Sequence, residues 1–229
     1  MLPLVNWLTN HGSDVYLVTL SGHHPNGIDL KEITAYTWQE EMLRSYKAAR
    51  EASLNNSVPL YFLGYSLGAL LGQTMIQLPG QNIPFHKQIL MAPAVAIRPR
   101  AYLLKCLFFF GKGIMIPSYT PERHRVNKSL PLRIYQIIFE EERKFLQTGF
   151  NGSTIPTLIF IDPKDELISY RKLVRYTNKL QSSNYQLVTL DDDLTHRNTN
   201  YHHLIIDEET MGRKNWEIAT KKMEEFFFN

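Results

Sequence analysis

A serine between two glycines is the residue whose setting best fits covalent chemistry in this sequence. Ser66 lies in the stretch Gly64-Tyr65-Ser66-Leu67-Gly68. An apolar run at 60–63 enters this stretch, and a segment rich in helix formers begins at Ala69. A strand, a sharp turn and a helix in this order expose a serine hydroxyl at the edge of a sheet, beside the start of the helix. Ser66 is therefore predicted to be a nucleophile rather than only the N-cap of that helix.

The sequence also predicts close packing at the two glycines beside this serine and a role for the backbone N–H that follows it. The turn should crowd the neighbouring strand and helix, so side chains at Gly64 and Gly68 are expected to clash. The N–H of Leu67, directly after the nucleophile, is expected to stabilise the oxyanion that forms at a reacting carbonyl.

A serine hydroxyl is a weak nucleophile that needs a histidine base, which a carboxylate holds in one tautomer. Suitable residues occur later in the chain, on loops that follow predicted strands. The acidic candidates lie in Asp162-Pro163-Lys164-Asp165-Glu166, and the histidine candidates are the neighbours His202 and His203. Nucleophile, acid and base thus have the order expected for a parallel sheet of this kind. The acidic run at 191–193 is instead interpreted as a solvated loop.

The elements that must position these residues alternate along the chain. Apolar runs predict strands at 15–20, 59–63, 86–92, 157–161 and 185–190. Helical periodicity predicts helices at 3–10, 37–52, 69–77, 170–180 and 215–227. The alternation predicts an α/β fold, with a mostly parallel sheet and helices on both of its faces.

One domain over 1–229 with a single insertion is expected. A chain of 229 residues, of which 44% are hydrophobic, can bury a sizeable core, and no repeat or linker divides it. The alternation is lost at about 98–152, between two predicted strands, which predicts an inserted helical lid. The lid is either an apolar wall over Ser66 that receives an acyl chain or a cover for the sheet edge. Its apolar residues are Leu103, Leu104, Leu107, Phe108, Phe109, Phe110, Ile114, Met115 and Ile116.

Together these stretches resemble the α/β-hydrolase superfamily, most closely its monoglyceride-lipase, lysophospholipase and serine-aminopeptidase-like branch. The resemblance extends over nearly the whole chain. It implies that Asp165 is the acid, and that Asp162 only begins a turn. Both histidines fit the family pattern of an aliphatic residue two positions on and an acidic residue five positions on. His202 is favoured as the base, because a tyrosine precedes it as in lipase relatives, and His203 is the alternative.

The resemblance also implies a difference from the family at the N-terminus. A second oxyanion donor belongs on a loop after an early strand, and Ser66 comes too early in this chain for that loop to precede it. About two or three strands and this donor are therefore expected upstream of Met1, and a truncated reading frame is favoured over a genuinely shortened protein. In a shortened enzyme, loss of one donor lowers turnover by about 10²–10³, and the predicted strand at 15–20 has a bare edge.

Composition argues against several other classes of protein. The 25 basic and 22 acidic residues are spread along the chain, without the basic stripe that binds nucleic acid. No cofactor motif or metal-binding pattern is found, so neither is expected. The single cysteine, Cys106, rules out an internal disulfide and is expected to be buried. The apolar segment at 101–116 is too short and interrupted to span a membrane, and without a secretory signal a cytoplasmic protein is expected.

These expectations combine into a serine hydrolase that cleaves carboxylic esters through an acyl-enzyme. Monoacylglycerols and lysophospholipids are the first candidate substrates, and transient contact of the apolar lid with a membrane surface is compatible with its composition. The oligomeric state stays open. The alternatives are a non-catalytic binding protein of the same fold, a peptidase and an acyltransferase, because a triad does not determine its substrate.

Overall fold

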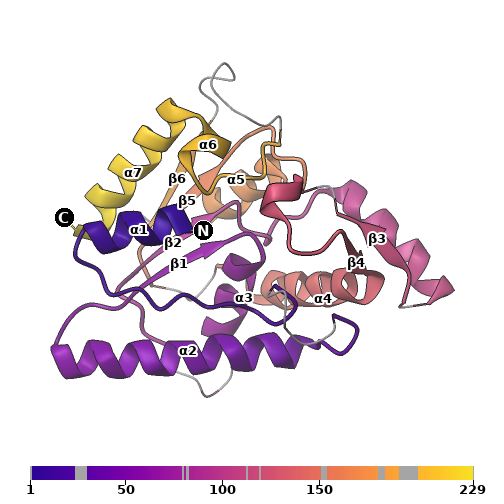
Figure 1. Cartoon of the computed structure of the whole chain (residues 1–229), viewed down its shortest axis with the longest axis horizontal. Helices are drawn as coiled ribbons and strands as arrows, with labels where there is room; N and C mark the ends of the chain where they lie inside the picture. Colours follow the sequence, from indigo (N-terminus) through magenta and orange to yellow (C-terminus); the bar gives the residue numbers. More distant parts are fainter. Residues whose placement is uncertain are drawn as a thin grey trace.

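A parallel sheet forms the centre of the computed structural model, which describes residues 2–23, 30–78, 80, 83–111, 113–118, 120–150, 154–179, 184–190 and 201–228. Its described strands lie in the order β1-β2-β5-β6 and all pair in parallel (Figure 1). They are β1 (Tyr61–Tyr65), β2 (Lys87–Met91), β5 (Thr157–Ile161) and β6 (Tyr185–Thr189). Consecutive residues of β5 are completely buried, as expected for a strand covered on both faces.

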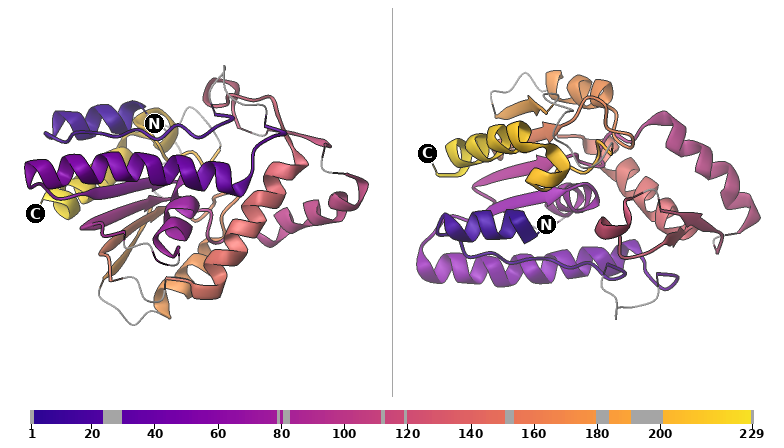
Figure 2. Two further views of the ribbon diagram at one scale, coloured as in Figure 1. Left: turned by 90° about the horizontal axis from the view of Figure 1, so that it is seen from below. Right: turned by 45° about the horizontal axis from the view of Figure 1, so that its top comes forward.

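Helices cover both faces of this sheet (Figures 1 and 2). On one side α1 packs beside α7, where the rings of Trp7 and Phe228 lie 6.2 Å apart. On the other side α3 packs against β1, α2 and α4. The α/β class predicted from the sequence is therefore confirmed. The helices are α1 (Leu2–Asn10), α2 (Ala35–Asn56), α3 (Leu67–Ile76), α4 (Leu132–Thr148), α5 (Tyr170–Asn178), α6 (Glu208–Met211) and α7 (Arg213–Phe228).

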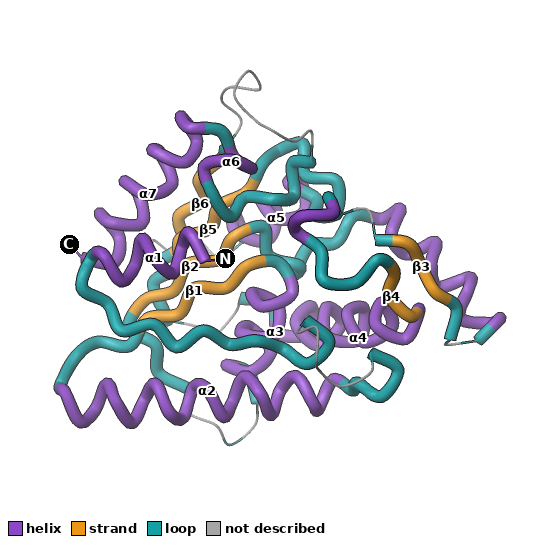
Figure 3. The backbone as a smooth tube through the Cα atoms, viewed as in Figure 1, coloured by secondary structure: helices purple, strands orange, loops and turns teal. Residues whose placement is uncertain are grey.

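The predicted strand at 15–20 is wrong. This segment runs as a loop between α1 and α2 and joins no ladder in the described part of the chain (Figure 3). Leu20 is buried beside Trp38 of α2, whereas Tyr16 and Leu17 are about half exposed, at 48% and 49%. β-branched and apolar residues favour an extended backbone, but a strand also needs a partner that takes up its hydrogen bonds.

The segment between β2 and β5 is more varied than a helical insertion. It contains the 3₁₀ helices η1 (Pro99–Phe110) and η2 (Glu122–His124), the antiparallel pair β3 (Met115–Pro117) and β4 (Ser129–Pro131), and then α4. In Figure 1, η1 and the β3–β4 pair lie to one side of the central sheet. The boundaries of a lid remain a prediction.

The side chains of η1 are largely accessible to solvent. None of its residues is buried, and Cys106 is exposed. The expectation of a buried cysteine is therefore wrong, because no described segment buries the side chains of η1. No helix in the described residues combines the length and apolarity that crossing a membrane requires.

A buried carboxylate joins η1 to the body of the protein. Glu142 of α4 is 2% exposed and accepts hydrogen bonds from the N–H of Ile97 at 2.9 Å and the hydroxyl of Tyr102 at 2.6 Å. Lys172 of α5 donates to the carbonyl of Ile97 and lies over the Tyr102 ring. Burial raises the pKa of Glu142, although these hydrogen bonds oppose the shift.

Two glycines allow α3 to pack closely on β1. A Cβ atom at Gly64 would lie 2.7 Å from the Cα of Ala69, and one at Gly72 would lie 2.2 Å from the ring of Phe62. A Cβ at Gly68 would meet no atom within 4 Å. The predicted clash is thus confirmed at Gly64 and wrong at Gly68. The tight contact at Gly72, one turn further along α3, was not predicted.

Alanine substitutions should separate these glycines. Gly64→Ala is expected to lower the free energy of unfolding by about 1–3 kcal/mol, because backbone atoms must move to admit the methyl group. Gly68→Ala is the matched control and should change it by less than about 0.5 kcal/mol. Urea unfolding measures both values, and equal effects would contradict the packing described for this turn.

The raised pKa of Glu142 predicts a pH dependence of stability. Protonation of this carboxyl favours the folded state, so its contribution is complete below its ordinary pKa of 4.5 and is lost as the pH rises through the raised folded-state value. The unfolding free energy of the wild type should therefore fall relative to that of Glu142→Gln as the pH rises above about 4.5. Urea titrations at several pH values test this, and a constant difference would refute it.

Candidate active site

Ser66 sits in a strained turn between β1 and α3. Its backbone angles are φ 49° and ψ −113°, in the left-handed half of the map that residues other than glycine rarely occupy. The turn is held because the N–H of Ser66 donates to the carbonyl of Met91 at 2.9 Å, and its carbonyl accepts from the N–H of Ala94 at 3.1 Å. The Ser66 side chain makes no capping hydrogen bond to α3, so the hydroxyl is directed elsewhere.

The hydroxyl of Ser66 begins a chain of hydrogen bonds through a histidine to a carboxylate. Ser66 Oγ lies 2.8 Å from Nε2 of His203, and Nδ1 of His203 lies 2.8 Å from Oδ2 of Asp165. When Nδ1 donates its proton to Asp165, Nε2 is left to accept the serine proton. His203 and Asp165 are 5% and 0% exposed, which shields both contacts from water.

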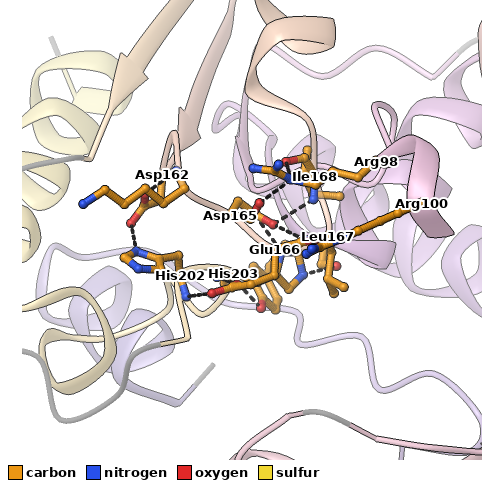
Figure 4. Close-up of polar contacts among 12 residues, drawn as sticks. Arg98, Arg100, Asp162, Asp165, Glu166, Leu167, Ile168, His202 and His203 are labelled. Carbon is orange, nitrogen blue, oxygen red and sulfur yellow. Dashed lines mark hydrogen bonds and ion pairs between the residues drawn. The ribbon is translucent and has the colours of Figure 1, made fainter.

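Asp165 is held firmly by the loop that carries it. Its Oδ1 atom accepts hydrogen bonds from the N–H groups of Leu167 and Ile168, both at 2.7 Å (Figure 4). The guanidinium of Arg98 donates to the carbonyl of Asp165 at 2.6 Å. One carboxylate oxygen is thus used to position the residue, and the other faces the imidazole.

Among the described residues, no hydrogen bond joins His202 to Ser66. Its Nδ1 atom lies 2.8 Å from Oδ2 of Asp162 instead (Figure 4). The structure therefore places the alternative, His203, beside the serine, and not His202, which the sequence favoured. Neighbouring residues on this loop direct their rings to different carboxylates, so only one ring reaches Ser66. Asp162 has the predicted turn contact, because its Oδ1 accepts from the N–H of Lys164 at 2.8 Å, and it also holds His202.

Two residues that were not predicted contact the backbone of the histidines. The carboxylate of Glu166 accepts from the N–H of His202 at 2.9 Å and from that of His203 at 3.0 Å. The hydroxyl of Tyr65 donates to the carbonyl of His203 at 3.1 Å, and desolvation raises the pKa of Tyr65 well above its ordinary value. The sequence carries one signal for Glu166: three carboxylates lie within five residues at 162–166, and two adjacent histidines occur later in the chain.

Leu67, the predicted oxyanion donor, is the first residue of α3. The first four N–H groups of a helix have no acceptor within it. The Leu67 N–H is therefore one of those that can bind a negatively charged oxygen beside Ser66.

The acidic run at 191–193 lies outside the described residues. Within the described residues, no cluster of three or more His, Cys, Asp or Glu is arranged to hold a metal ion.

The geometry supports proton transfer and nucleophilic attack. A hydroxyl at a strained turn, a histidine at hydrogen-bond distance and a buried carboxylate behind the histidine make up the arrangement that activates serine. Such an arrangement suits acyl transfer, with helix N–H groups placed to stabilise an oxyanion.

Comparisons with known proteins describe the fold. No protein-family model matches the chain, and no curated protein matches it. Among solved structures, a substrate-analogue complex of a soluble variant of monoglyceride lipase from Saccharomyces cerevisiae is 13% identical, with a TM-score of 0.65, and the match covers 85% of this chain and 69% of that one.

Two further solved structures are similar over more of the chain. One, from work on the metagenome-derived lipolytic enzymes LipS and LipT, is 16% identical with a TM-score of 0.68, covering 98% of this chain and 86% of that one. The other, Est1E from Butyrivibrio proteoclasticus with ferulic acid bound, is 18% identical with a TM-score of 0.61, covering 92% and 76%. These similarities, together with the parallel sheet and the turn at Ser66, show that the chain has the α/β-hydrolase fold.

Proposed function

We propose that this protein is a serine hydrolase that cleaves carboxylic esters through an acyl-enzyme. The observation that carries the proposal is the continuous set of hydrogen bonds from Ser66 through His203 to Asp165, with a distance of 2.8 Å at each step. The lipases and esterases among the similar solved structures are consistent with this activity.

In the proposed mechanism, His203 takes the proton of Ser66 as the serine oxygen attacks the ester carbonyl. Asp165 stabilises the imidazolium, and the N–H of Leu67 donates to the oxyanion. His203 then protonates the departing alcohol, which leaves the acyl group on Ser66. A water molecule that His203 deprotonates attacks this ester, and proton return to Ser66 releases the carboxylic acid.

Lipid esters are the proposed substrates, because η1 exposes large apolar side chains. Phe109, Phe110 and Leu103 are 93%, 75% and 72% exposed. A soluble protein rarely presents a run of such residues without a binding role. Monoacylglycerols and lysophospholipids combine a carboxylic ester with an acyl chain that this surface can receive, with 98–152 acting as the lid.

The charges of the same segment favour a transient contact with an anionic membrane surface. Basic residues attract anionic lipids while neighbouring apolar side chains enter the interface. Only one acidic residue, Glu122, occurs between 98 and 131. The basic residues of this stretch are Arg98, Arg100, Lys105, Lys112, Arg123, Arg125 and Lys128.

Labelling with a fluorophosphonate probe tests the catalytic assignment. The wild type should be labelled, and Ser66→Ala should not. His203→Ala should slow labelling by about 10³ or more, whereas His202→Ala should stay within about tenfold of the wild type. Asp165→Asn keeps an acceptor for two N–H groups but turns His203 to the wrong tautomer, so a folded variant slowed by about 10⁴ is expected.

Thermal unfolding of each variant provides the control for folding. Loss of labelling in His202→Ala together with survival in His203→Ala would restore the assignment first favoured from the sequence. A folded wild type that does not react would instead support a non-catalytic binding protein. Ester, amide and acyl-acceptor substrates then distinguish a hydrolase from a peptidase or an acyltransferase.

Vesicle co-sedimentation tests the lid surface. The wild type should bind vesicles that contain phosphatidylglycerol more strongly than pure phosphatidylcholine vesicles, and added salt should weaken binding. Because each phenylalanine loses apolar burial, Phe109→Asp with Phe110→Asp should reduce partitioning by about tenfold or more. Tyr36→Asp, at an exposed aromatic on α2, is the matched control. Equal binding by all these proteins would reject the membrane contact.

A further inference from the structure

His203 has a hydrogen-bond partner at every polar atom it possesses. Its ring contacts Ser66 through Nε2 and Asp165 through Nδ1, both at 2.8 Å. Its N–H donates to Glu166 at 3.0 Å, and its carbonyl accepts from Tyr65 at 3.1 Å. The triad geometry requires the two ring contacts, whereas the two backbone contacts come from side chains that the proposed mechanism does not use.

These backbone partners extend from the segments that carry the other two triad residues. Tyr65 directly precedes Ser66, and Glu166 directly follows Asp165. One main-chain contact of His203 therefore comes from the serine turn, and the other comes from the acid loop. Ser66 and Tyr65 contact the ring and the carbonyl of His203, and Asp165 and Glu166 contact its ring and its N–H.

Glu166 also holds the residue before the base. Its two carboxylate oxygens accept from the consecutive N–H groups of His202 and His203, while Asp162 contacts the ring of His202 (Figure 4). A carboxylate that accepts two main-chain N–H groups fixes the position and the direction of the loop. The ring of Tyr65 lies 5.4 Å from that of His203, which limits movement of the imidazole from the other side.

We propose that Tyr65 and Glu166 are positioning residues, which hold the main chain of His203 on both sides so that its ring stays aligned with Ser66. This inference rests on the proposed function. A displacement of about 1 Å between reacting groups can lower a rate by about 10². Neither residue contacts the reacting atoms, so both act through His203.

Conservative substitutions provide the test. Tyr65→Phe keeps the ring and removes one donor, and Glu166→Gln replaces one of two acceptor oxygens with an NH₂ group that faces an N–H. Hydrolysis of p-nitrophenyl butyrate should show kcat reduced by about fivefold in Tyr65→Phe and about tenfold in Glu166→Gln, with KM unchanged. Tyr36→Phe and Glu217→Gln, at exposed side chains on α2 and α7, should retain wild-type values.

Measuring the same two substitutions in the His203→Ala variant separates a positioning role from a general loss of structure. In His203→Ala neither substitution should change the residual rate, because the residue through which they act is gone. Wild-type kcat in folded Tyr65→Phe and Glu166→Gln would overturn the proposal, and so would an equal fold-loss in the His203→Ala background. If His203→Ala itself reacts like the wild type, His203 is not the base and this inference fails. If instead the wild type does not hydrolyse the ester, or Ser66→Ala hydrolyses it equally fast, the proposed function fails, which is a distinct outcome.

Discussion

The left-handed backbone at Ser66 is the constraint on which the rest of this site depends. A residue with a side chain occupies that conformation at a cost of about 1–3 kcal/mol, so the surrounding structure must enforce it. The parallel strand β2 does so, since its last residue, Met91, accepts the N–H of Ser66. Close packing at Gly64 then lets α3 begin immediately after the turn. The direction of the hydroxyl toward His203 is a consequence of how the strand and helix meet.

A second group of contacts brings the acid loop and the base loop together. Three carboxylates at 162, 165 and 166 bind two consecutive histidines through their rings and their main-chain N–H groups. Asp165 itself is fixed by N–H groups of its own loop, so its orientation does not depend on His203 alone. The site thus combines local turns with contacts between distant segments.

The segment after β2 combines a buried anchor with an exposed surface. Glu142 and Tyr102 attach η1 to α4 inside the protein, while Phe109 and Phe110 at the end of η1 are exposed. A polar anchor of this kind holds the start of the helix without covering its apolar side chains. Such an arrangement leaves an apolar surface exposed and keeps it attached to the domain that carries Ser66.

The sequence by itself determined the α/β class, the described strands of the central sheet and Ser66 as a candidate, because strand alternation and the Gly-x-Ser-x-Gly turn are local patterns. The resemblance to a known family pointed to Asp165. It did not determine the segment at 15–20, since a strand requires a pairing partner that propensity does not specify. It favoured His202 over His203, although both share the same local pattern. Only the tertiary structure places the ring of His203 beside Ser66, because the direction of each ring depends on which carboxylate, Asp162 or Asp165, lies opposite it.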